Sequence, residues 1–75
     1  MSLDDNINVA VGMALRKKRE ALKVSQDTFA DSIKMHRASY SAIERGERNL
    51  TLRILAIVSK GLNVKLAEIF RTAGL

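Results

Sequence analysis

Segment 37–45 combines two arginines with small side chains and holds no acidic residue until Glu44. If this segment is helical, its solvent face presents Arg37, Ala38, Ser41, Ala42 and Arg45. An arginine can donate two parallel hydrogen bonds to O6 and N7 of guanine, and small side chains allow close approach to the bases. Most solvated helix faces mix acids and bases. This short, polar and cationic face therefore indicates contact with DNA bases.

Residues suited to catalysis are scarce. Acid–base or nucleophilic catalysis needs a positioned pair of groups that exchange a proton. His36 is the only histidine, neither Ser39 nor Ser41 has an evident partner base, and the chain has no cysteine. A glycine-rich phosphate loop is also absent. We therefore predict no enzymatic activity, no metal site and no cofactor, and we expect His36 to cap a helix.

The composition fits a small nucleic-acid-binding domain. A chain of 75 residues is expected to form one domain, 1–75. Its net charge of +5 and pI near 10.1 favour a polyanionic partner. The aromatic content of 4% argues against stacking of single-stranded bases. The chain shows no signal peptide and no run of about 18 apolar residues, so we expect a cytoplasmic protein without a membrane partner.

Apolar residues recur at helical spacing, and proline is absent. The pattern predicts an all-α fold, a compact five-helix bundle with helices at 8–22, 26–33, 37–45, 52–61 and 66–72. Ser25 and Thr51 are expected to cap helices, and Gly46 is expected to end one. The inward faces are expected to carry Val11, Leu15, Leu22, Phe29, Ala30, Ile33, Tyr40, Ile43, Leu52, Leu55, Val58, Leu62, Leu66, Ile69 and Phe70.

The helices at 26–33 and 37–45 are separated by a very short turn. This is the geometry of a helix-turn-helix, in which the second helix lies in the major groove of DNA. The small side chain of Ala30 would let the two helices approach closely. The pattern alone is equally typical of two core helices in a bundle, and only the side chains of segment 37–45 favour DNA binding.

From residue 11 to residue 70 the chain resembles the phage repressor and Cro-like helix-turn-helix family. The matching residues are Val11-Gly12, Leu15-Arg16, Arg19, Ser25-Gln26, Ala30, Arg37, Ser41, Ile43-Glu44-Arg45-Gly46, Arg48-Asn49, Leu52, Leu62, Val64 and Leu66-Ala67-Glu68-Ile69-Phe70. The stretch His36-Arg37, Tyr40 and IERGERNLTL is most similar to the controller proteins of restriction–modification systems. The resemblance implies a lambda-repressor-like DNA-binding domain.

The resemblance also implies individual roles. Base contacts are expected from Arg37, Ala38, Ser41 and Ala42. Phosphate contacts are expected from Gln26, His36, Ser39, Arg45, Arg48 and Asn49. Gln26 is expected to brace the recognition helix as well, although an ordinary exposed polar residue stays an alternative. The chain departs from the family at Lys34, where glycine is usual, and at Leu50, which replaces a common proline. A left-handed backbone at Lys34 would cost about 1 kcal/mol.

Four charged residues that are not expected to contact bases lead to two further predictions. Arg19 and Glu44 lie on the inward sides of otherwise apolar stripes, and the resemblance pairs them, so we expect a buried ion pair. Asp27 and Asp31 are four residues apart and share a helix face. In phage repressors that activate transcription, matching acidic positions contact RNA polymerase. Ordinary solvated acids are the alternative.

A symmetric homodimer is expected from the apolar surplus of segment 52–61. Ile54, Ile57 and Gly61 recur on a second face, and Leu75 could extend it. Contiguous exposed apolar area usually marks an interface, and a two-fold axis uses the same patch twice. In the competing interpretation, both isoleucines pack under the last helix of the same chain.

Together these patterns predict a transcriptional regulator that binds a palindromic site in double-stranded DNA. The narrower resemblance suggests the controller protein of a restriction–modification system. The alternative is an antitoxin that represses its own operon through the same domain, with a toxin as its protein partner. No small-molecule effector is expected, because no second domain could bind one.

Overall fold

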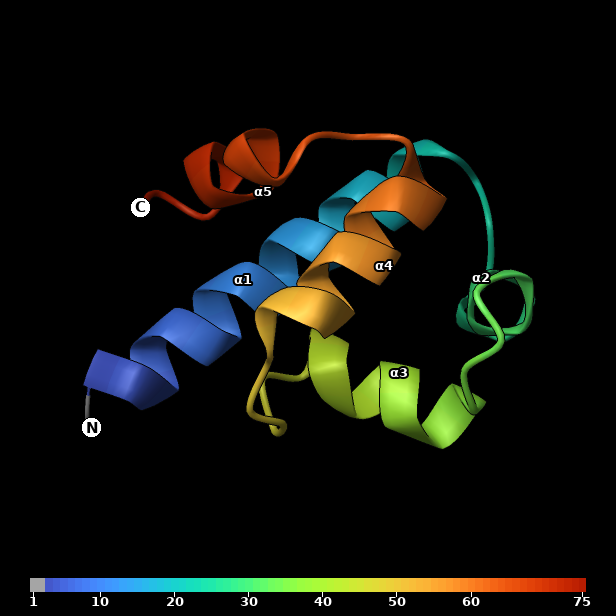
Figure 1. Ribbon diagram of the computed structural model, residues 1–75, viewed down its shortest axis with the longest axis horizontal. Coiled ribbons are helices and arrows are strands. Elements are labelled where there is room, and N and C mark those ends of the chain that lie inside the picture. The colour runs from blue at the N-terminus through green and yellow to red at the C-terminus, as the bar shows by residue number, and fades with distance from the viewer. Residues whose placement is uncertain (1–2) are drawn as a thin grey trace.

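The computed structural model describes residues 3–75 and contains five helices in that range. They are α1 (Leu3–Ala21), α2 (Gln26–Ser32), α3 (Arg37–Glu44), α4 (Leu52–Leu62) and α5 (Leu66–Thr72). Residues 3–75 include no strand, so the predicted all-α fold is confirmed. Figure 1 shows α1 running through the molecule, with α4 beside it, α5 towards one end and α3 below. None of the described helices is long and apolar enough to cross a membrane.

The ends of the helices follow local signals. Ser25 accepts a hydrogen bond from the Thr28 amide at 3.1 Å, and Thr51 accepts one from the Ile54 amide at 3.1 Å, so both predicted caps are present. Gly46 follows α3 with φ of 74°, the left-handed conformation expected of it. His36 occupies the position that caps α3, but its side chain makes no capping hydrogen bond. The predicted capping position of His36 is therefore confirmed, although the imidazole itself supplies no capping hydrogen bond.

α1 differs most from its predicted bounds of 8–22. It begins at Leu3, because a helix can extend beyond its apolar face by adding one backbone hydrogen bond per residue. It ends at Ala21, and Lys23 has a left-handed φ of 59°. This turn carries Leu22 away from the core and leaves it 49% exposed. The expectation that Leu22 packs inward is wrong.

The core lies between α1 and the helices around it. Its largest fully buried side chains are Tyr40, Leu15, Ile43, Leu62, Ile69 and Val58. The rings of Phe29 and Tyr40 pack with their centroids 5.0 Å apart, which joins α2 to α3. Leu55, Val58 and Leu62 form the buried stripe of α4, but Leu52 is 75% exposed. Leu52 is the first residue of α4, at the edge of the bundle, so its expected inward position is wrong.

Gly12 sets the distance between α1 and the end of α3. A Cβ atom at this position would lie 2.6 Å from the carbonyl oxygens of both Ile43 and Glu44, far closer than van der Waals contact allows. The absence of a side chain therefore lets α1 and α3 touch through their backbones. This contact places the C-terminal end of α3 against α1.

Candidate nucleic-acid interface

The turn between α2 and α3 fixes the relative position of the two helices. The amide of Met35 donates to the carbonyl of Ala30 at 2.9 Å, and Ala30 is buried where the helices meet. Lys34 has φ of 58°, so it adopts the left-handed backbone that its family usually gives to glycine. The turn therefore keeps helix-turn-helix geometry at a cost in strain of about 1 kcal/mol.

The outer face of α3 carries the four residues expected to contact bases. Arg37 and Ala38 are exposed, and Ser41 and Ala42 are half-buried beside them. Arg45 continues this face at the end of the helix, where its guanidinium donates a hydrogen bond to the Ser41 hydroxyl. The structure thus brings the expected base-contacting side chains together on one exposed surface.

The residues expected to contact phosphate surround this face. His36 is exposed and Ser39 is half-buried, both in or next to the first turn of α3. Arg48 and Asn49 lie exposed in the loop after α3. The Asn8 side chain donates to the Asn49 side chain at 3.4 Å, so the loop is tied to α1. Arg45 pairs with Glu47 at 3.0 Å, and the hydrogen bond between them raises the pKa of Arg45.

A buried ion pair connects the C-terminal end of α3 to α1. Arg19 donates to Glu44 through Nε at 2.7 Å and through Nη2 at 3.1 Å, so the pair expected from the sequence is present and bidentate. A third nitrogen of Arg19, Nη1, donates to the carbonyl of Val24 at 2.7 Å. Gln26 donates to Glu44 at 2.8 Å, which links the start of α2 to the end of α3. Gln26 therefore braces the recognition helix through Glu44.

Burial and hydrogen bonding set the pKa values of Glu44 and Arg19, and so decide whether each group is charged. Burial by itself would raise the pKa of Glu44, but the hydrogen bonds from Arg19 and Gln26 outweigh burial and hold its pKa below the usual value. The hydrogen bond to Glu44 also raises the pKa of Arg19. Both groups are therefore charged at neutral pH. Burial raises the pKa of the neighbouring Tyr40 hydroxyl well above its ordinary range, so that group stays neutral.

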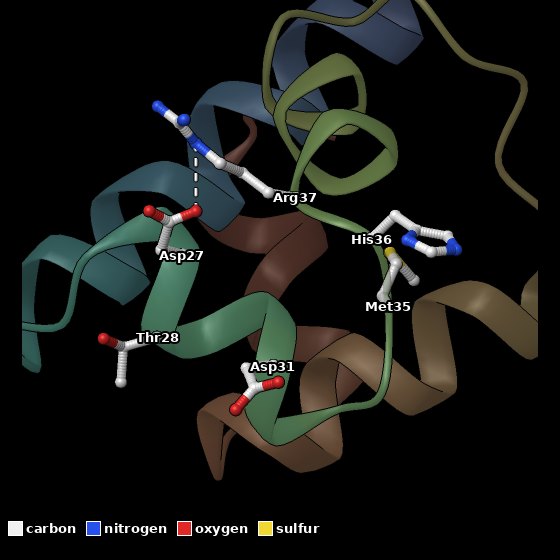
Figure 2. Close-up of a pocket in the computed structure, with 6 residues that line it drawn as sticks. All are labelled: Asp27, Thr28, Asp31, Met35, His36 and Arg37. Carbon is white, nitrogen blue, oxygen red and sulfur yellow. Dashed lines mark ion pairs between the residues drawn. The ribbon is translucent and has the colours of Figure 1, made fainter.

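An exposed groove lies between the start of α3 and the outer side of α2 (Figure 2). It is lined by Asp27, Thr28, Asp31, Met35, His36 and Arg37. Asp27 and Arg37 form an ion pair across it, with 3.1 Å between Oδ1 and Nε. We did not anticipate this pair from the sequence. The available signal was the presence of opposite charges in the first turns of two adjacent helices. Among the described residues, no three His, Cys, Asp or Glu side chains cluster in a way that could hold a metal ion.

The four residues expected at a dimer interface have different surroundings. Ile57 is 42% exposed and Leu75 is 63% exposed, so Ile57 does not pack under α5. Ile54 is half-buried and packs against the core of its own chain. A Cβ atom on Gly61 would lie 2.6 Å from the Ile33 side chain and 3.2 Å from the Phe29 ring. The missing side chain of Gly61 therefore makes room for α2, while Gly61 itself is exposed, and its contact with a partner helix stays a prediction.

Comparison with known proteins gives consistent matches. A family model described as helix-turn-helix matches residues 15–69. The control protein C.MunI from Mycoplasma sp. is 39% identical over 67 residues, which cover 88% of this chain and 90% of the relative.

Solved structures extend the similarity to the fold. The restriction–modification controller protein C.AhdI from Aeromonas hydrophila has a TM-score of 0.79 and 32% identity, covering 83% of this chain and 94% of that one. The controller protein C.Esp1396I, solved as a tetramer with its natural 35 base-pair operator, has a TM-score of 0.82 and 29% identity. That match covers 97% of this chain and 92% of the other.

Proposed function

Because this chain belongs to the helix-turn-helix family of DNA-binding regulators, we propose that it is the controller protein of a restriction–modification system. In this proposal it binds an operator in double-stranded DNA as a homodimer, with one copy of α3 in the major groove of each half-site. The relatives that it matches are control or controller proteins, and one of them was solved in complex with its natural operator.

The observation that carries this proposal is the outer face of α3. Arg37 is exposed at the start of the helix, with the small side chains Ala38, Ser41 and Ala42 beside it. Such a face can approach base edges closely and donate two hydrogen bonds to a guanine. The exposed Arg48 and Asn49 would contact the phosphates and fix the orientation of the domain, as phosphate contacts do in protein–DNA complexes.

Selection of bound sequences from random duplex DNA tests this function. We expect an enriched site with two inverted half-sites, separated by about 34 Å or a multiple of that distance. Recovery of sequences that match unselected DNA would contradict the proposal. Enrichment of a single, non-repeated half-site would contradict the dimer but not the DNA binding.

We place the dimer contact at the exposed face of α4, with Ile57 at its centre and Leu75 at its edge. An isolated DNA-binding domain of this size touches few bases, so two copies on a palindrome increase specificity. Burial of Ile57 and Leu75 against a second copy would also remove exposed apolar area from water. Ile54, on the same helix, is half-buried and packs against the core of its own chain.

Sedimentation of Ile57→Glu tests this placement. A charge in the interface should convert the dimer to a folded monomer. Leu22→Glu is the comparison variant, because Leu22 is similarly exposed but lies just beyond the end of α1 and not on α4. A dimer that persists in Ile57→Glu, or dissociates equally in both variants, would place the interface elsewhere.

Asp31 is the residue we propose for contact with RNA polymerase. It is exposed on the outer side of α2, and among the ion pairs of the described residues none involves it, whereas Asp27 is paired with Arg37. A transcription assay with Asp31→Asn should show operator binding at least as tight as that of wild type, together with reduced activation. Full activation by this variant would leave Asp31 as an ordinary solvated acid.

A further inference from the structure

The ion pair between Asp27 and Arg37 joins an acid to the arginine that lies at the start of the base-contacting face. Both side chains are 68% exposed, and Arg37 belongs to the face that we propose contacts DNA, so the pair is accessible from that face. An exposed pair of this kind contributes little to stability, with typical values of about 0.2–1 kcal/mol. The stability of the fold therefore gives little reason for an acid at position 27. The effect of Asp27 on the orientation of Arg37 is a better explanation for it.

The ion pair leaves the two terminal nitrogens of Arg37 available to contact a base. The nitrogen closest to the carboxylate is Nε, at 3.1 Å from Oδ1. Figure 2 shows the terminal nitrogens of Arg37 beyond this contact, pointing away from Asp27. Bidentate recognition of guanine needs two parallel N–H groups, and Nη1 and Nη2 supply them without breaking the ion pair.

We propose that Asp27 is a positioning residue that determines specificity by holding the Arg37 guanidinium in the orientation that contacts guanine. This inference rests on the proposed DNA-binding function. An arginine side chain loses substantial rotamer entropy when it is fixed on a base. An ion pair that already restricts Arg37 in the free protein reduces that loss, and it disfavours other orientations in which Arg37 would bind a phosphate at any sequence.

The same carboxylate opposes DNA through its charge. Asp27 lies beside the face that would approach the phosphates, so it repels every duplex regardless of sequence. Asp27 therefore has two separable effects: it lowers affinity for all DNA, and it increases the preference of Arg37 for guanine. An acid that only contributed net charge would produce the first effect alone.

Asp31 provides the matched control for this distinction. It has the same charge, lies one turn further along α2 and lines the same groove. Figure 2 draws the ion pair to Asp27 and none to Asp31. Replacing either aspartate with asparagine removes one negative charge with almost no change in shape. Only the change at Asp27 removes the partner of Arg37.

The experiment measures affinity for the selected operator, for operators changed at each base pair, and for an unrelated duplex. In Asp27→Asn we expect discrimination at the base pair contacted by Arg37 to fall about two- to fivefold, which corresponds to loss of an exposed ion pair. Affinity for the unrelated duplex should rise roughly twofold. In Asp31→Asn we expect only that rise. In an Arg37→Ala background, Asp27→Asn should no longer change discrimination at any base pair.

Several outcomes would overturn the inference. Unchanged or improved discrimination in Asp27→Asn would show that the pair does not orient Arg37. An equal loss in Asp31→Asn would assign the effect to net charge, and a loss that persists without Arg37 would show that Asp27 acts through another group. If Asp27→Asn loses activation but keeps its base preference, Asp27 contacts polymerase instead. Failure of the proposed function is distinguishable, because wild-type protein would then prefer no duplex.

Discussion

Two arginine–carboxylate pairs involve α3, one at each end of the helix, and their surroundings differ completely. The side chains of Arg19 and Glu44 are 10% and 2% exposed, whereas those of Arg37 and Asp27 are both 68% exposed. The distances are similar, at 2.7 Å and 3.1 Å. Burial therefore separates a pair that holds the fold together from a pair that can act on a ligand.

Hydrogen bonding adds to this difference. The buried pair is bidentate, and each partner is bonded to a further group, Val24 for Arg19 and Gln26 for Glu44. Removal of one partner would strand a charge in the core. The exposed pair is surrounded by water, which can solvate either partner alone. The same two chemical groups thus hold the fold together at one end of α3 and, as we propose, orient a base-contacting arginine at the other end.

The largest expected effect is the loss of stability in Glu44→Ala. Removal of one partner from a buried ion pair costs about 3–5 kcal/mol, a large part of the stability of so small a domain. Chemical unfolding measures the change. Glu20→Ala is the matched control, because Glu20 pairs with Arg16 at 3.1 Å on the surface, and it should lose less than about 1 kcal/mol. Equal losses in the two variants would remove the distinction between buried and exposed pairs.

Acid should weaken the buried pair in the wild-type protein. Because the pKa of Glu44 is lower in the folded state than its usual value of 4.5, its contribution to stability is present above about pH 4.5 and is lost as the pH falls through the folded pKa. Unfolding measured between pH 7 and pH 3 should therefore show a smaller acid-induced loss in Glu44→Gln than in wild type. Identical pH profiles would mean that Glu44 is not stabilised in its charged form.

The exposed side of α3 should respond in binding rather than in stability. Arg37→Ala should change the free energy of unfolding by less than about 1 kcal/mol. Loss of a bidentate contact with guanine should reduce discrimination at one base pair by about 1–3 kcal/mol. Binding to operators changed at each position measures this. The control is Arg48→Ala, which should weaken binding evenly at all sequences and reduce the salt dependence. An unchanged base preference in Arg37→Ala would exclude Arg37 from base recognition.

The smallest expected effect concerns the turn that connects the two helices of the motif. Lys34→Gly should stabilise the protein by up to about 1 kcal/mol, because glycine adopts φ of 58° without strain. Lys17→Gly, in the middle of α1, should instead destabilise by about 1 kcal/mol. Thermal unfolding of both variants tests the reversal in sign. Destabilisation by Lys34→Gly would mean that the lysine side chain supplies a contact that outweighs the strain.

Much of the architecture was predictable because its signals are local. The bounds of α5 were predicted as 66–72 and are Leu66–Thr72. The caps at Ser25 and Thr51 also follow from residue type and position. The pairing of Arg19 with Glu44 came from the family resemblance together with their inward positions. A helical period and a capping residue need no knowledge of distant parts of the chain.

Other features depended on contacts between distant segments. The sequence by itself determined the helices, the helix-turn-helix and the cationic face of α3, because hydrophobic periodicity and side-chain chemistry are properties of short segments. Only the tertiary structure decided that Leu52 stays in water, that Gly61 makes room for Ile33, and that Asp27 pairs with Arg37. These outcomes depend on how helices are placed against one another, and that placement is set by packing across the whole core.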